Sequence, residues 1–448
     1  MSDGVLTTWS PIVTCYLMLA RASAAGAFAD AYRQACESTD GHALVRLLKN
    51  EPDAYAALHT ELAGVDIPSL CAQIQLTKVP QAQAKRLADL ASSYLEYART
   101  DDRKSASIAA YDAWATVFAR AVAVFTLDVP WFSPALKYVG NVTVELAVRS
   151  DRDGAHGKMV DAAGRLSKCA ALSANDRTPG RMADTKRVNA LALANLSFRA
   201  YLRLRNTRLC ETVLGSVQNA LQMNIRHDGL DESATGEEGY PMSERVVFHY
   251  YIGRIRLAYG RVTVAAQHLR WAFDRCPKSS RHNRRIIAIP LTCAYITLGR
   301  YPTHELLTEC NLVDHFGTLV HCMRLGHGAG VLAELLRHRD WLRFQGLYGL
   351  LSEKLLLGTW RNLFRRCLLL EPATDTNAPP TLRLSTVLVA ARYAWQDPYL
   401  TADDIECFAA NLIDQGLIKA YILHANGIMV LQKGPHRGFV QPASVFLR

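Results

Sequence analysis

Hydrophobic positions follow a helical period over most of the chain. In the N-terminal part, apolar residues three and four apart recur in four alanine- and leucine-rich stretches, residues 7–36, 54–73, 81–99 and 105–126. This spacing places the apolar side chains on one face of an amphipathic helix. Strand-like alternation of apolar and polar residues does not occur there. The pattern therefore predicts a mainly α fold for this part of the chain.

A more polar stretch interrupts the pattern between residues 150 and 185. It is rich in Gly, Asp, Arg and Ser and contains the sequence Thr178-Pro179-Gly180. Such residues favour turns and irregular connections. We therefore predict a mobile connection in this stretch, and we place the end of an N-terminal helical region, residues 1–185, at its close.

Beyond residue 185 the predicted helices come in pairs. Asn206 separates Leu191–Leu204 from Cys210–Met223, and Gly260 separates Glu244–Tyr259 from Val262–Cys276. Helix pairs with a turn-favouring residue at the corner are typical of tetratricopeptide (TPR) repeats. The pattern continues with an acidic loop at 227–242 and with the helical segments Arg284–Leu298, Pro302–Cys310 and Gly330–Arg337. The sequence thus predicts TPR-like helical hairpins over residues 186–340.

The last part of the chain combines helices with two short β-segments. The β-segments, Lys419–Leu423 and Gly427–Gln432, flank Ala425-Asn426-Gly427, and Asn-Gly is a strong hairpin signal. A capping box at Thr401 and Asp404 begins the preceding helix, and Gly416 ends it. The other helices predicted here are Leu342–Leu356, Trp360–Leu370 after Gly358-Thr359, and Leu382–Ala394 after a proline-containing loop at 372–380. Helices followed by a terminal hairpin predict a winged-helix subdomain over residues 341–448.

Composition indicates a large folded protein. Of 448 residues, 50% are hydrophobic and 21% are charged, which suits two or three structural units. The apolar stretch Ile12–Ala20 is short and has no Lys or Arg before it, and no apolar run appears long enough to cross a bilayer, so neither a secretory signal nor a membrane span is expected. Eleven cysteines lie scattered without CxxC pairs, which suits reduced thiols in the nucleus or cytoplasm.

Charge is distributed unevenly along the chain. Residues 1–180 carry 18 basic and 19 acidic side chains, whereas residues 181–448 carry 33 and 22. The second part therefore holds a net charge of +11 and the first a net charge of −1. Such a bias favours a polyanionic partner, either nucleic acid or an acidic polypeptide.

Ten basic residues form the predicted nucleic-acid-binding set: Lys278, Arg281, Arg284, Arg285, Arg361, Arg365, Arg366, Lys419, Lys433 and Arg437. The first four begin a helix, the next three are spaced to lie on one side of a helix, and the last three surround the wing. Such groups would neutralise phosphates and make binding depend strongly on salt. For the first four, the alternative is a helix start capped by Ser280 or Asn283, with its arginines solvated or paired within the fold.

Several motifs have only a partial likeness to catalytic ones. His338-Arg339-Asp340 resembles a kinase catalytic loop, but Gln345 stands where that loop needs Asn. The Gly-rich stretch 326–330 lacks the Gly-Lys-Ser/Thr ending of a phosphate loop. The residues that could bind a metal by type are Cys310, His315, His321, Cys322 and His327, and their spacing favours core or surface positions. We predict no enzymatic activity, no cofactor and no metal.

An ordered series of motifs carries a family resemblance. It runs through Phe248-His249-Tyr250-Tyr251-Ile252-Gly253-Arg254, Trp271-Ala272-Phe273, Cys276-Pro277-Lys278, Arg361-Asn362-Leu363-Phe364 and Gly416-Leu417-Ile418-Lys419-Ala420-Tyr421. Over residues 240–433 the chain resembles the PCI-domain subunit of the TREX-2 mRNA export complex, the family of PCI domain-containing protein 2. The N-terminal half shows no such likeness.

The resemblance implies a superhelix of TPR-like helical hairpins followed by a winged helix, together called a PCI module. It also implies a non-catalytic scaffold that pairs with a large scaffold subunit and a small acidic disordered subunit. Such a protein would bind RNA, and also DNA, during mRNA export at the nuclear pore. The alternative from another class is a purely structural PCI subunit of a proteasome-lid-like or COP9-signalosome-like assembly.

Overall fold

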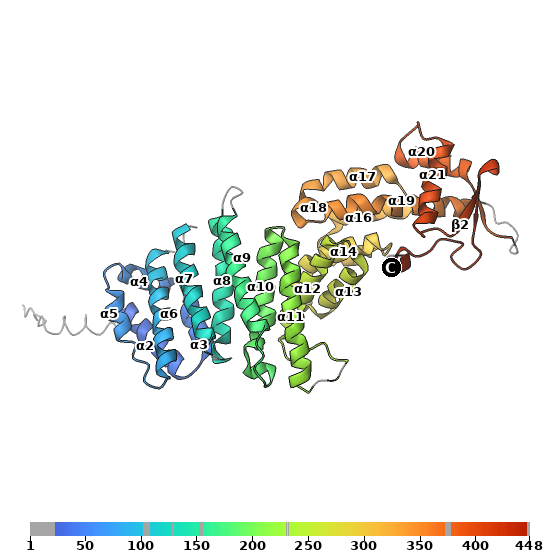
Figure 1. Cartoon of the computed structure of the whole chain (residues 1–448). Helices are drawn as coiled ribbons and strands as arrows, with labels where there is room; N and C mark the ends of the chain where they lie inside the picture. The colour runs from blue at the N-terminus through green and yellow to red at the C-terminus, as the bar shows by residue number, and fades with distance from the viewer. Residues whose placement is uncertain are drawn as a thin grey trace, which may run out of the picture. The chain divides into compact units, whose positions relative to one another are not determined.

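The computed structural model describes residues 23–101, 108–127, 130–151, 156–229, 231, 233–371 and 378–445. Helices make up most of these residues, and a small sheet lies near the C-terminus (Figure 1). The mainly α architecture expected from the periodicity is confirmed. The chain forms two compact units, Met1–Glu244 and Arg245–Arg448. The finer division into three regions made from the sequence stays a prediction.

Successive helices of the N-terminal unit pack side by side, and α6 to α11 follow one another as a row in Figure 1. The helices are α2 (Ala24–Glu37), α3 (Gly41–Lys49), α4 (Pro52–Leu62), α5 (Ile67–Ala72), α6 (Gln81–Thr100), α7 (Ile108–Phe125), α8 (Ser133–Ser150), α9 (Gly157–Ala174), α10 (Ala190–Arg203) and α11 (Thr207–His227). Three of the four predicted stretches match α2, α6 and α7, although residues 7–22 lie outside the described part. The fourth, 54–73, is divided into α4 and α5, because Asp66 caps the start of α5.

Helix α7 departs from the expectation that no apolar run could cross a bilayer. Among the described residues it is the one helix that is long and apolar enough to do so by length and composition. It packs against α6 and α8, and it buries Trp114, whose ring meets the edge of Tyr97 at 4.7 Å between centroids. These contacts are those of a core helix, which shares its composition with a membrane span.

The predicted mobile connection at 150–185 is wrong for most of its length, since α9 occupies its centre. Met159, Ala162 and Leu166 are buried at helical spacing, and α9 packs closely against α10. The Gly, Asp and Arg residues that suggested a loop lie between these apolar positions. Their composition therefore concealed a helical period that small side chains maintain.

The turn after α9 is held by a buried arginine. Arg187 is fully buried, and its guanidinium donates to the carbonyl oxygens of Asp176 (3.1 Å), Thr178 (2.9 Å) and Gly180 (2.8 Å). Its Nε also donates to the side chain of Asn224 on α11 at 3.0 Å. Backbone carbonyls thus replace a carboxylate as partners of the charge, and the polar turn is fixed to α11.

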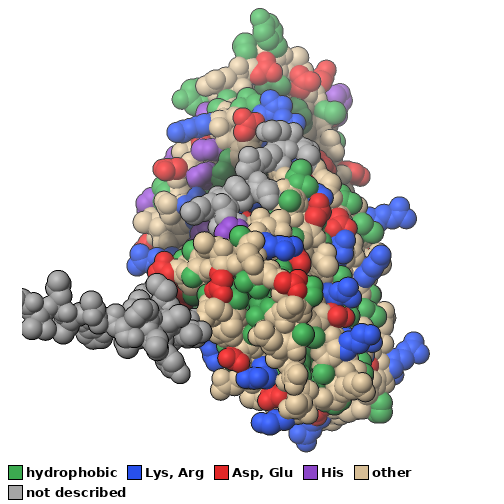
Figure 2. Space-filling model, turned by 90° about the vertical axis from the view of Figure 1, so that its left-hand side faces the viewer, with side chains coloured by type: hydrophobic (Ala, Val, Ile, Leu, Met, Phe, Trp, Pro, Cys, Tyr) green, Lys and Arg blue, Asp and Glu red, His purple; other side chains and the backbone are tan. Residues whose placement is uncertain are grey.

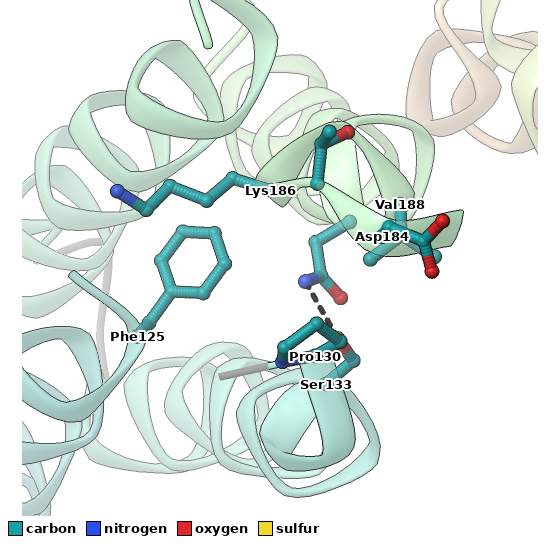
Figure 3. A pocket seen from close by; sticks show the side chains of 8 residues that line it. Phe125, Pro130, Ser133, Asp184, Lys186 and Val188 are labelled. Atoms are coloured by element: carbon teal, nitrogen blue, oxygen red, sulfur yellow. Dashed lines mark hydrogen bonds between the residues drawn. The ribbon is translucent and has the colours of Figure 1, made fainter. Parts of the chain in front are cut away.

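Beside this turn lies a small cavity, shown in Figure 3. Phe125, Pro130, Asp184 and Lys186 contribute to its lining, and Asn189 donates to Ser133 Oγ at 2.9 Å. Its volume is about 10 Å³, the least that holds one water molecule. The cavity is a packing defect and is too small for an organic ligand.

The C-terminal unit begins with helical hairpins. Its helices are α12 (Met242–Ala258), α13 (Val262–Arg275), α14 (Arg281–Thr297), α15 (His304–Glu309), α16 (Val313–Leu325), α17 (Gly328–Arg337), α18 (Arg339–Gln345) and α19 (Tyr348–Leu370). Gly260 turns the chain between α12 and α13 with a φ of +70°. Gly253 allows close approach there, because a Cβ at this position would overlap the side chain of Leu269. The predicted TPR-like pairing is confirmed for these helices.

The predicted helix break at Gly358-Thr359 is wrong. Helix α19 runs through both residues, and the break lies earlier, at Gly346, where φ is +73°. Thr359 is buried and donates to the carbonyl oxygen of Leu355 within the helix at 2.8 Å. Burial of this segment therefore outweighs the low helix propensity of the Gly-Thr pair.

The winged helix follows, with β1 (Thr381–Arg383), α20 (Leu384–Trp395), α21 (Ala402–Asp414), β2 (Ala420–Leu423), β3 (Ile428–Leu431) and the short helix α22 (Pro442–Val445). The antiparallel sheet has the order β1-β3-β2. The hairpin and the capping box of Thr401 and Asp404 are confirmed. Strand β1 was not predicted, because its three residues follow two prolines and carry no alternation that a sequence reading could detect.

Candidate nucleic-acid interface

Three of the predicted cations lie around the wing. The N–H of Lys419 donates to the carbonyl oxygen of Gly438 (2.7 Å), and the N–H of Gln432 donates to that of Lys419 (2.9 Å). These bonds fold residues 433–438 back against the start of β2. The exposed side chains of Lys419, Lys433 and Arg437 consequently line one surface hollow, here called the wing hollow. The sequence places these residues up to 18 positions apart, and the wing brings them together.

Arg361 does not belong to the exposed surface. Its side chain is buried, and its Nε and Nη2 donate to the carbonyl oxygen of Val440 at 3.1 and 2.6 Å. Burial, and after it the nearby charge of Arg365, lower the pKa of Arg361 to about 10. The expectation that Arg361 offers its charge to a ligand is therefore wrong, because its guanidinium donates its hydrogen bonds to atoms within the fold.

Arg365 and Arg366 are exposed on α19. Arg365 lies one turn beyond Arg361, which contacts Val440, and Val440 also lines the wing hollow. Arg365 itself does not line the wing hollow. All three arginines lie on α19, but the side chain of Arg361 is buried while those of Arg365 and Arg366 are exposed.

The cluster at 278–285 is also divided. Arg284 is buried, its Nη2 pairs with Glu309 Oε1 at 3.1 Å, and its guanidinium lies 4.1 Å from the centre of the Phe273 ring. Arg285 donates to the carbonyl oxygen of Asn311 at 2.7 Å. Lys278 and Arg281 are exposed. Pairing within the fold thus accounts for Arg284, whereas the expected cap is wrong, because Ser280 precedes α14 without a side-chain hydrogen bond.

The two basic groups lie at opposite ends of α14. Gly299, just past the end of this helix, is so close to Pro442 that a Cβ on the glycine would lie 2.9 Å from the proline Cγ. Pro442 lies between Gln441 and Ser444, which both line the wing hollow, whereas Arg281 begins the helix. A helix of 17 residues is about 25 Å long. The predicted set therefore forms two separate surfaces.

Two basic residues near the wing hollow were missed by the sequence analysis. Arg324 on α16 is exposed and lies over the ring of Tyr301, 5.5 Å from its centre. The hydroxyl of Tyr301 accepts a 2.7 Å hydrogen bond from Asn362, the neighbour of Arg361. Arg300 is exposed next to Tyr301. Each of these arginines is isolated among apolar residues in the sequence, so no local motif could have identified it.

Helix α21 carries the opposite charge. In a winged helix, the helix just before the hairpin is the one that usually enters a DNA groove. Here its charged residues are Asp403, Asp404, Glu406 and Asp414, with no Lys or Arg. His424 near the wing tip pairs with Glu406 at 2.9 Å, and this contact raises the pKa of the histidine. Reading of DNA bases by this helix is therefore electrostatically unfavourable.

Charge elsewhere is mixed. On the face shown in Figure 2, basic and acidic side chains are interspersed rather than gathered by sign. Within the part of the chain that the structure describes, no group of three or more His, Cys, Asp or Glu side chains is arranged to hold a metal ion.

The comparisons agree with the fold. Residues 335–433 match the family model of the PCI domain. Helical hairpins that lead into a winged helix, together with this match, define a PCI-domain protein. Proteins of this class are generally structural scaffolds.

The chain also resembles particular PCI proteins. It is 34% identical over 257 residues to PCI domain-containing protein C1105.07c of Schizosaccharomyces pombe, 57% of this chain and 55% of that protein. It is 29% identical over 281 residues to PCI domain-containing protein 2 of Xenopus laevis (62% and 64%) and 28% identical over 309 residues to that of Danio rerio (67% and 71%). The chain is thus similar to proteins named PCI domain-containing protein 2, as the motif series predicted. The matches span little more than half to about two thirds of these relatives.

Proposed function

We propose that the protein is a non-catalytic scaffold subunit of a TREX-2-like mRNA export complex that binds RNA or DNA through a basic surface of its winged helix. The observation that supports this most is the wing hollow, whose lining brings together Lys419, Lys433 and Arg437. Exposed cations around a hollow attract a phosphate backbone without reading its sequence. We also propose that the protein is located in the nucleus, associated with the nuclear pore, and in part in the cytoplasm.

The proposed partners are a large scaffold subunit and a small acidic disordered subunit, as the family resemblance implies. The net charge of +11 over residues 181–448 suits an acidic partner. Exposed apolar side chains of the winged helix suit a protein partner, with Val389, Tyr393 and Tyr399 exposed by 71%, 83% and 88%. Large exposed aromatic groups commonly mark protein interfaces.

The test measures the binding of single-stranded RNA to the full chain by fluorescence anisotropy at several salt concentrations. The triple variant Lys419→Glu/Lys433→Glu/Arg437→Glu should weaken binding at least about tenfold. Removal of three phosphate contacts should also reduce the slope of log affinity against log salt by about 2. Arg208→Glu, on exposed α11 surface of the N-terminal unit, serves as the charge control. Unchanged affinity and slope in the triple variant would contradict the proposal.

A second candidate is a structural PCI subunit of a proteasome-lid-like or COP9-signalosome-like assembly. It is favoured by β2, which is an edge strand of the sheet and exposes Tyr421 and Leu423. An edge strand can pair with a strand of another chain. Affinity purification of the tagged protein decides between the two candidates. Recovery of other PCI subunits without RNA at low salt would support the second.

A further inference from the structure

A second basic hollow lies on the helical hairpins of the C-terminal unit, between α15, α16 and α17. Its volume is about 520 Å³, and Leu307, Val313 and Val320 provide an apolar floor. Its charged and titratable lining consists of His304, His321, Arg324, Arg337 and one carboxylate, Asp314. We call it the α16 groove. Apart from Asp314 and Thr318, the polar side chains of its lining are therefore those of arginine and histidine.

The α16 groove connects with the wing hollow through a chain of contacts. Arg324 lines the groove and lies over Tyr301, and the hydroxyl of Tyr301 accepts from Asn362. The next residue, Arg361, bonds to Val440 in the lining of the wing hollow. Exposed Arg300 follows Gly299, which lies against Pro442 between the lining residues Gln441 and Ser444. The two hollows are thus close to each other at the C-terminal end of α14.

We infer that the α16 groove is a second site for the phosphate backbone of single-stranded nucleic acid, and that one strand continues into it from the wing hollow. The inference rests on the proposed function and extends it. A single strand is flexible enough to bend from the wing onto the hairpins, whereas a duplex is stiff over such a distance. The exposed imidazoles of His304 and His321 offer flat surfaces on which bases can stack, as aromatic groups do in single-strand-binding proteins.

An acidic peptide is the competing occupant, because an apolar floor with a basic rim suits it too. Continuity with the wing hollow favours nucleic acid. A peptide held in the α16 groove would have no need of the basic residues that lead to the wing. Chain length therefore distinguishes a continuous strand from a separate ligand, since only a long strand reaches both hollows.

The experiment measures binding of the full chain to oligouridylates of two lengths, about 5 and about 20 nucleotides, a range that brackets typical single-strand sites. The groove variant is His321→Ala/Arg324→Ala. Its matched control is Arg226→Ala/His227→Ala, which removes an exposed arginine and an exposed histidine from the last turn of α11. Arg324→Lys keeps the charge, and thermal melting verifies that each variant folds.

We expect the groove variant to lose about tenfold in affinity for the long strand and nothing for the short one, while Arg324→Lys and the control keep both affinities. The triple variant of the wing hollow should lose affinity for both lengths. If the wing variant weakens binding but the groove variant matches the control at both lengths, the inference fails and the proposed function stands. If the unaltered chain binds neither strand, both fail. Binding of polyglutamate that the groove variant abolishes, with RNA affinity unchanged, would assign the groove to an acidic peptide and overturn the inference.

Discussion

Arg361 donates two hydrogen bonds to the backbone carbonyl oxygen of Val440, a residue 79 positions further along the chain. The same guanidinium lies 5.7 Å from the centre of the Phe439 ring, which is fully buried. A single buried charge thereby fastens the segment after the wing to α19. Phe439 and Val440 both line the wing hollow, so this contact holds part of its wall in place.

Substitution of this arginine should release the segment. We expect Arg361→Met to lower the free energy of unfolding by about 2–3 kcal/mol, because charge-assisted hydrogen bonds are lost and a carbonyl is left without its donors. Urea denaturation measures the change. Arg366→Met, on the exposed surface of the same helix, should stay within about 0.5 kcal/mol of the unaltered protein. Equal stabilities of the two variants would show that the Val440 contact has no structural role.

Arg187 should matter still more to the N-terminal unit. Arg187→Met removes four hydrogen bonds of a fully buried guanidinium and leaves three turn carbonyls and Asn224 without that donor, so we expect a loss of at least about 3 kcal/mol. Limited proteolysis should cut near Thr178 faster, since the turn is no longer held. Arg177→Met, exposed in the same turn, provides the control. A turn that resists protease equally in both variants would contradict the assigned role.

The His424–Glu406 pair should stabilise the winged helix at mildly acidic pH. Its carboxylate raises the pKa of His424 above the ordinary value of 6.5. Because the folded state binds the proton more tightly, the contribution is fully present below pH 6.5 and is lost as pH rises through the folded pKa. Proton NMR titration of the ring measures this pKa directly. Glu406→Gln should return it toward 6.5, and a titration unaffected by that change would rule out the pairing.

His315 should act in the opposite sense. Burial, the neighbouring His338 and then Arg285 lower its pKa, against a weaker opposing effect of Asp314. The unfolded chain therefore binds the proton more readily, so stability is intact above pH 6.5 and declines as pH falls through the folded pKa. Melting temperatures across this range test the expectation. His315→Gln should flatten the decline, whereas His321→Gln, exposed on the same helix, should leave it as it is.

Sequence periodicity predicted most helices because the apolar positions that a helix buries lie three and four residues apart in the sequence. It could not tell that Arg361 turns inward while Arg365 stays exposed, since the deciding contact comes from Val440, far away in the chain. The α16 groove was not predicted for the same reason, because its residues come from three helices and become neighbours only after folding. Helix α9 was missed because its apolar face consists largely of alanine, which composition alone does not distinguish from a polar loop.

Helix α19 belongs to two cores at once. Leu351 and Leu355 pack among the helical hairpins, whereas Trp360 and Phe364 pack in the winged helix, with Trp360 stacked between Trp395 and Phe408. Because this helix is continuous and packs into one core at each end, a displacement of one end also moves the other. Unfolding of either core would expose the buried face of half of this helix, so the two cores should unfold in a single transition. A winged helix cut free after Leu355 would lose its long support, and a ligand that tilts the wing must also tilt the last hairpins.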